Sequence, residues 1–187
     1  MLNYFYDKFI MTSTLRYTHN NFYLLDIPFA ITPTETLIAI SSIEEEPFRK
    51  KLYETIKKDT NEKLLAQFSF NFGLDKKKEL DLFKDYLTAS GWGSLQMIDF
   101  NMETKRAIVV EENSPIAVPL KGKSAFATDT ILRGLLAGAF SKVFEEDIDC
   151  VEAECAAQNS ERCKFILKPK KEFDFASAVV QQQLSTE

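Results

Sequence analysis

Residues 131–169 read ILRGLLAGAFSKVFEEDIDCVEAECAAQNSERCKFILKP, and this stretch decides how the chain folds. In its first part apolar residues recur every three or four positions, which predicts a helix from about Ser124 to Phe144. Gly134 and Gly138 leave one face of that helix bare, so another element should pack closely against it. In its second part IDCVEAECA and RCKFILKP alternate around a polar turn, which predicts a hairpin that ends at Pro169.

Two of the three cysteines, Cys155 and Cys163, lie beside this predicted turn, and Glu152 lies three residues before the first of them. Two thiolates and a carboxylate can contribute to a tetrahedral zinc shell. In a regular strand Glu152 and Cys155 point to opposite faces, so joint binding requires a bulge or the strand's end near Cys155. The alternative is that both thiols are small buried hydrophobes and Glu152 is solvated. Cys150, on the same strand face as Glu152, is then a core residue or a substitute ligand.

Upstream of this stretch, WGSLQMIDFNM and KRAIVVEEN alternate as strands and predict another hairpin, which ends before Ser114 and Pro115. Before it, helical spacing runs from Pro47 to Gly73, as one helix or two, and again up to the stop at Ser90 and Gly91. The middle of the chain is therefore predicted to be helical.

A further helix is predicted from about Thr34 to Glu45, with Thr32 as its cap, Pro33 in the first helical position and Glu35 reaching back. The first thirty residues are rich in aromatic and branched side chains, which predicts strands. The order of strands, helices, hairpin, helix and hairpin indicates an α+β domain with a small antiparallel sheet packed against several helices.

The 187 residues suit one domain, in which we distinguish residues 1–90, the N-terminal strands and helices, from residues 91–170, the core with the hairpin. The formal net charge of −5 disfavours nucleic acid and anionic membranes as partners. No run approaches the length of a membrane span and the start lacks a signal-peptide layout, so we expect a cytoplasmic protein. The odd number of cysteines likewise disfavours a disulfide framework.

Residues 131–169 resemble the C-terminal signature of the 4-vinyl reductase domain family, a predicted hydrocarbon-binding module. That signature has a glycine-containing helix, Glu-x-x-Cys, a turn and Cys-x-Phe, here Arg133 to Gly138, Glu152 to Cys155 and Cys163 to Phe165. The segment from Gly91 to Ala117 resembles the family's central hairpin. The resemblance implies an α+β ligand-binding domain of the type shared by NO-signalling and Golgi-transport proteins. Its standalone archaeal members match the N-terminal half only in layout.

In the phenol-sensor branch of this family, zinc is held by Glu-x-x-Cys, the following Cys and a fourth cysteine at the start of the helix. By this resemblance the ligands here are Glu152, Cys155 and Cys163, with Asp129 in the fourth position. An aspartate oxygen can ligate zinc. Alternatively, Asp129 complements the helix dipole and binds nothing, and Cys150 completes the site. A closed shell of this kind implies structural zinc rather than catalysis.

The resemblance also implies a cavity for a small apolar or aromatic molecule and a homodimer formed through the N-terminal strands and long helices. The aromatic candidates for this cavity are Phe68, Phe72, Trp92, Phe100, Phe126 and Phe140, each of which could instead be ordinary core. Two other functions stay open: an interaction module like the subunits of the TRAPP tethering complex, and an accessory protein or reductase for tetrapyrrole vinyl groups. We expect no enzyme, because nucleotide-binding and nucleophile motifs are absent and His19, the one histidine, suits an exposed turn.

Overall fold

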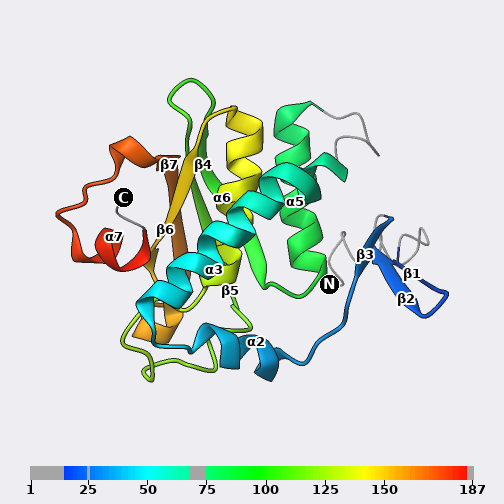
Figure 1. Cartoon of the computed structure of the whole chain (residues 1–187), viewed down its shortest axis with the longest axis horizontal. Helices are drawn as coiled ribbons and strands as arrows, with labels where there is room; N and C mark the ends of the chain where they lie inside the picture. Colours follow the sequence, from blue (N-terminus) through cyan, green and yellow to red (C-terminus); the bar gives the residue numbers. More distant parts are fainter. Residues whose placement is uncertain (1–14, 25, 68–74, 185–187) are drawn as a thin grey trace.

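The computed structural model describes residues 15–24, 26–67 and 75–184, and the structural statements that follow concern these residues. They form a four-stranded antiparallel sheet of order β4-β5-β7-β6 and a separate three-stranded sheet of order β1-β2-β3. Helices α3, α5 and α6 lie along one side of the larger sheet, and the segment that follows β7 lies on the other side (Figure 1). This arrangement confirms the predicted α+β architecture of an antiparallel sheet packed against helices.

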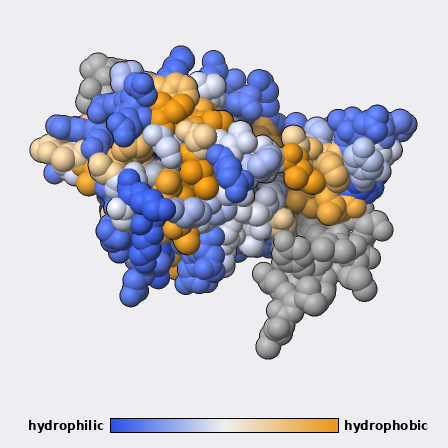
Figure 2. All heavy atoms as spheres, turned by 90° about the horizontal axis from the view of Figure 1, so that it is seen from below, coloured by the Kyte–Doolittle hydropathy of each residue, from blue (hydrophilic) through white to orange (hydrophobic). Residues whose placement is uncertain are grey.

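The N-terminal sheet consists of β1 (Leu15–Thr18), β2 (Asn21–Leu24) and β3 (Ile27–Phe29), and it projects from the body (Figure 1). His19 and Asn20 form the β1–β2 turn with positive φ angles, as expected of an exposed turn. Apolar side chains gather where this sheet joins the body (Figure 2). The strands expected between Asn3 and Met11 lie outside the described residues.

Helix α2 (Thr34–Ser41) is shorter than predicted, and its expected cap does not form. Pro33 itself is the N-cap residue, with no side-chain hydrogen bond, so Thr32 lies one residue too early to reach the first free amide groups. Helix α3 (Glu46–Asp59) follows and passes directly into a π-helical turn, η1 (Thr60–Leu64). The predicted end of this helical region at Gly73 lies outside the described residues.

Helix α5 (Lys76–Ala89) begins with a cap, because the Asp75 side chain accepts a hydrogen bond from the Lys78 backbone amide. Strands β4 (Ser94–Asn101) and β5 (Arg106–Glu112) form the predicted first hairpin. Buried residues on β5 include Ala107, Val109 and Glu111, which alternate and therefore share one face of the strand.

Helix α6 (Thr130–Phe144) starts six residues later than predicted, because residues 115–129 form turns and extended chain instead. The bare face expected at Gly134 and Gly138 is confirmed. A Cβ atom at Gly138 would lie 2.4 Å from the Lys57 carbonyl oxygen, and one at Gly134 would lie 2.9 Å from Ile56. The two glycines thus let α6 lie directly against the backbone of α3.

Strands β6 (Ile148–Glu154) and β7 (Cys163–Pro169) form the predicted second hairpin, with a 3₁₀ turn η2 (Ala156–Gln158) after β6. After β7 come a 3₁₀ turn η3 (Lys170–Glu172) and a short helix α7 (Ala178–Gln183). None of the helices in the described ranges has the length and apolarity that crossing a bilayer requires.

The outer edge of β6 is closed by side chains rather than by another strand. The Cys150 amide donates to the Tyr53 hydroxyl, and the Arg133 guanidinium donates to the Cys150 carbonyl oxygen. The Gln183 side-chain amide bonds both the amide and the carbonyl group of Glu152, at 2.8 Å each. Helices α3, α6 and α7 therefore satisfy an edge that would otherwise be open to pairing.

Candidate metal centre and ligand pocket

The end of β6 brings Glu152 and Cys155 to the same side of the sheet. The β6–β7 register shifts between Glu152 and Glu154, and β6 ends at Glu154, so Cys155 leaves the strand geometry. Both conditions required for joint binding, a bulge and a strand end, are present. Cys163 begins the neighbouring strand β7, so the hairpin brings it next to them.

Asp129 lies at the N-cap of α6 but does not cap the helix with its side chain. Its carboxylate instead accepts hydrogen bonds from the Cys163 thiol, at 3.2 Å, and from the Ser114 hydroxyl. Its backbone amide donates to Glu152 Oε2 at 3.1 Å. Asp129 is therefore turned into the cluster, an orientation that the alternative of a residue serving only the helix dipole does not explain.

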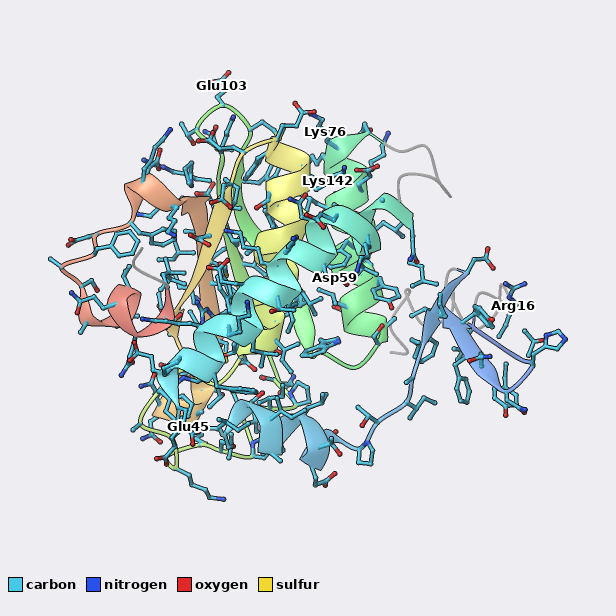
Figure 3. The ribbon with its side chains drawn as sticks, in the orientation of Figure 1. Arg16, Glu45, Asp59, Lys76, Glu103 and Lys142 are labelled. Atoms are coloured by element: carbon cyan, nitrogen blue, oxygen red, sulfur yellow. The ribbon has the colours of Figure 1, made fainter. Side chains whose placement is uncertain are left out.

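Asp129, Glu152, Cys155 and Cys163 form one group, in which one ligand atom from each residue lies within 4.8 Å of the others. All four are at most 2% exposed. Ordinary acidic residues of this chain behave differently: Glu45 and Glu103 point away from the body (Figure 3). Cys150 is buried but lies outside the group, and burial raises the pKa of its thiol, as for a protonated core residue.

Crowding of acidic groups in a sealed space shifts their proton affinities. Burial, and then Cys155, raises the pKa of Asp129 to about 6, and burial with Asp129 raises the pKa of Glu152 well above its usual range. Hydrogen bonding to Cys163 lowers the pKa of Cys155 to about 5, whereas this contact raises the pKa of Cys163. A cation held among these groups would relieve their mutual repulsion.

The residues present fit a metal ion of the zinc type. Tetrahedral zinc with bonds of about 2.0–2.3 Å places its ligand atoms about 3.3–3.8 Å apart, so the four side chains need to contract only slightly. Glu152 Oε1 is buried and has no hydrogen-bond partner in the described part of the chain, which leaves it free to bind an ion. Among the same residues no lysine or arginine forms an ion pair with Asp129 or Glu152.

A fifth acidic residue, Glu111, was not singled out from the sequence. It is 1% exposed, stands opposite Cys163 in the β5–β7 register, and has no hydrogen-bond partner on either carboxylate oxygen among the described residues. Burial, and then Asp129, raises the pKa of Glu111 to about 10, while the nearby Ser114 hydroxyl and Cys163 thiol oppose this shift. The signal was a glutamate on the apolar face of β5, in phase with Ala107 and Val109.

A pocket of about 380 Å³ borders α6 at Leu135 and shares no lining residue with the metal centre. Its walls come from the end of β3 and the chain leading into α2, from η1, from the end of α5 and the turn after it, and from α6. The lining residues are Phe29, Ala30, Ile31, Thr32, Thr34, Leu37, Leu64, Tyr86, Leu87, Ser90, Gly91, Trp92, Pro115 and Leu135. None of them is charged and none is a cysteine.

The six aromatic candidates for a ligand cavity do not come together. Trp92 lines the pocket. Phe100 packs against Phe140, with ring centroids 6.4 Å apart, and Phe126 lies under the Arg49 guanidinium at 3.9 Å. Phe68 and Phe72 lie outside the described residues.

Comparison with known proteins places this geometry among known folds. The family model of the vinyl-4-reductase type, the 4-vinyl reductase domain, matches residues 130–169. No curated protein is significantly similar to the chain in sequence. The crystal structure of the phenol-responsive sensory domain of the transcription activator PoxR with phenol superposes with a TM-score of 0.72, at 15% identity, over 95% of both chains.

Two further solved structures are similar. One is a trafficking protein particle complex subunit 3 from Naegleria fowleri covalently bound to palmitic acid, with a TM-score of 0.53 and 15% identity over 73% of this chain and 90% of that one. The other is a vinyl-4-reductase family protein from Methanocaldococcus jannaschii, with a TM-score of 0.45 and 18% identity over 75% and 98%. The resemblance to 4-vinyl reductase domains is thus confirmed: α6, β6 and β7 are matched by the family model, and the whole chain has the fold of the PoxR sensory domain.

Proposed function

We propose that this protein is a sensor domain that binds a small, uncharged apolar or aromatic molecule in the 380 Å³ pocket and is stabilised by a structural zinc ion. The observation that carries the proposal is the lining of the pocket, which is mostly apolar and contains no charged side chain. Ligand pockets of proteins have this character, with a few polar groups that fix orientation. Here the hydroxyl groups of Thr32, Thr34, Ser90 and Tyr86 are of that kind.

The lining also limits the class of ligand. A carboxylate or ammonium group without a partner would cost several kcal/mol to bury, so a charged ligand is disfavoured. No cysteine lines the pocket, so a thioester bond to an acyl chain cannot form there. A cavity of about 150 Å³ holds benzene, so 380 Å³ suits a molecule of about two rings or a short alkyl chain. Phenol, which the similar PoxR domain binds, is within this class.

Trp92 is the chain's only tryptophan and lines the pocket, so its fluorescence reports on this site alone. We expect 1-octanol and phenol to change the Trp92 emission with saturation, and octanoate, the charged match of octanol, to bind at least about tenfold more weakly. Leu37→Lys should narrow that difference by supplying a cation, whereas Val118→Lys, on an exposed position outside the pocket, should leave it unchanged.

The outcomes separate two parts of the proposal. If octanoate binds as tightly as octanol to the wild-type protein, ligand binding stands but the uncharged class is wrong. If none of the three probes alters the emission, the pocket is not a ligand site for such molecules, and a role as an interaction module becomes the better proposal.

The metal part of the proposal rests on the group formed by Asp129, Glu152, Cys155 and Cys163. These residues would hold zinc through two thiolates and two carboxylate oxygens. When bound, such an ion contributes folding free energy and leaves no position for a catalytic water. The residues come from the start of α6, the end of β6 and the start of β7, so the ion would fasten the last hairpin to the helix that also borders the pocket.

A further inference from the structure

Three of the four buried side-chain oxygen and nitrogen atoms without a hydrogen-bond partner in the described chain lie at one place. They are both carboxylate oxygens of Glu111 and Oε1 of Glu152; the fourth is the Ser41 hydroxyl. Buried polar groups are normally satisfied, so each exception calls for a physical reason. For Glu152 the reason is metal ligation, as proposed above. Glu111 requires its own.

Glu111 is next to the ligand group but is not part of it. It lies on β5, directly opposite Cys163 of β7, and side chains that face each other across a strand pair have Cβ atoms about 4.5–5.5 Å apart. The polar side chains that bear on its carboxyl group include Ser114 and Cys163. Ser114 in turn donates to Asp129. Glu111 therefore borders two of the four ligand residues from the side of β5.

The backbone holds Glu111 in this position. Gly93, in the turn before β4, has a φ angle of +81°, a region that glycine tolerates. A Cβ atom at Gly93 would lie 3.2 Å from Glu111 Cγ and 2.8 Å from the Glu112 carbonyl oxygen. The turn thus covers Glu111 closely and keeps its carboxyl group directed away from solvent.

We propose that Glu111 is the outer-shell partner of Cys163 in the metal centre: its carboxyl group donates a hydrogen bond to the Cys163 sulfur once an ion has taken that sulfur as a thiolate. This inference rests on the proposed metal centre. In the structure the Cys163 thiol donates to Asp129 Oδ2. Metal binding removes that proton, so the sulfur becomes an acceptor and needs a donor beside it.

The chemistry favours an outer-shell role over direct ligation. Two thiolates and two carboxylates already exceed the charge of a dication, and a third carboxylate ligand would add to the excess. No lysine or arginine of the described residues pairs with Glu111, so a neutral carboxyl group, which can donate a hydrogen bond, is the form that suits this sealed place. Outer-shell partners of this kind orient a ligand and strengthen its bond to the ion.

The test compares Glu111→Gln, which keeps a neutral hydrogen-bond donor, with Glu111→Leu, which removes it. Full-length protein is stripped with a chelator, and Zn²⁺ affinity is measured by chelator competition. Co²⁺ is then added and the sulfur-to-cobalt charge-transfer and d–d bands are recorded. Glu112→Leu is the matched control, because Glu112 is the next residue on β5, is exposed and faces the other way.

We expect Glu111→Leu to weaken Zn²⁺ binding by about 10–100-fold, the usual cost of losing an outer-shell partner, and to shift the charge-transfer band. Glu111→Gln should bind within a few fold of wild type with the same spectrum, and Glu112→Leu should be unchanged. Without metal, Glu111→Leu should melt at a higher temperature than wild type, because it removes a buried unpaired polar group. A residue with a purely structural role would not give opposite changes in stability and metal affinity. Should Glu111→Leu fail to fold, Glu111→Met, an unbranched replacement of similar size, takes its place.

Each contrary result has a definite meaning. Equal Zn²⁺ affinity in wild type and Glu111→Leu would remove Glu111 from the centre. Loss of affinity in Glu111→Gln as great as in Glu111→Leu, with altered d–d bands, would show that Glu111 is a direct ligand and would overturn the outer-shell assignment. If the wild-type protein binds neither Zn²⁺ nor Co²⁺, the metal centre itself is wrong, which is a failure of the proposed function rather than of this inference alone.

Discussion

Cys155 and Cys163 supply both sulfur atoms of the candidate metal centre, so their replacement is its most direct test. We expect Cys155→Ser and Cys163→Ser each to lose bound zinc and to lose at least several kcal/mol of the zinc-dependent stability, measured by metal analysis and thermal melting with and without chelator. Cys150→Ser, at a buried cysteine outside the group, should lower stability but keep full metal content. Unchanged metal content in both of the first two variants would refute the zinc site.

Sequence spacing predicted the positions of Glu152, Cys155 and Cys163 in one hairpin, and the family resemblance added Asp129. The structure brings these four together, although their ligation of an ion stays a prediction. Glu111 could not be found in this way, because it lies far upstream of the hairpin in the sequence and is brought there by the β5–β7 pairing. Of the aromatic candidates in the described residues only Trp92 lines the pocket; the walls formed by β3, α2 and η1 depend on how distant segments pack.

Among the elements, the contact between α6 and α3 depends on Gly138. Gly138→Ala places a methyl group 2.4 Å from the Lys57 carbonyl oxygen, which forces the helices apart. We expect this overpacking to cost about 1–3 kcal/mol, against a gain in helix propensity of about 1 kcal/mol. Lys142→Ala, at an exposed position of the same helix, should change stability little when both are compared by urea unfolding. A Gly138→Ala protein as stable as wild type would mean that the helices can separate freely.

The elements themselves were largely predictable, because apolar periodicity, glycine and proline positions mark both hairpins and the long helices. Their ends were less so. Helix α2 lacks the predicted cap, and α6 begins at Thr130 because residues 115–129 satisfy Ser114 and Asp129 through turns rather than through a helix. The π turn η1 has no simple sequence signal, since its wider winding is set by the packing of Thr60 against Gly138.

At the scale of the whole molecule, the homodimer expected from the sequence stays a prediction, and the structure shows where to test it. Leu15 and Tyr17 on β1 are 46% and 61% exposed, which is unusual for large apolar side chains on a short sheet. If the N-terminal strands form the dimer contact, Leu15→Glu and Tyr17→Glu should convert dimer to monomer in native mass spectrometry, because carboxylates buried in an interface are costly. Val118→Glu, at a 48% exposed position on a turn, is the control. A wild-type monomer at micromolar concentration would exclude this assembly.

The close packing of α6 on α3 also bears on how the chain is made. A protein leaves the ribosome from its N-terminus, at about 5–20 residues per second, so α3 emerges several seconds before α6, which lies roughly eighty positions later in the chain. During that interval the partners of Tyr53 and Lys57, which are Asp149 and the backbone of Cys150, do not yet exist. The metal ligands, in contrast, span only residues 129–163 and emerge almost together. The last third of the chain is therefore the part whose own short-range contacts can form first, and nascent α3 has to be kept from aggregating until that part is ready to receive it.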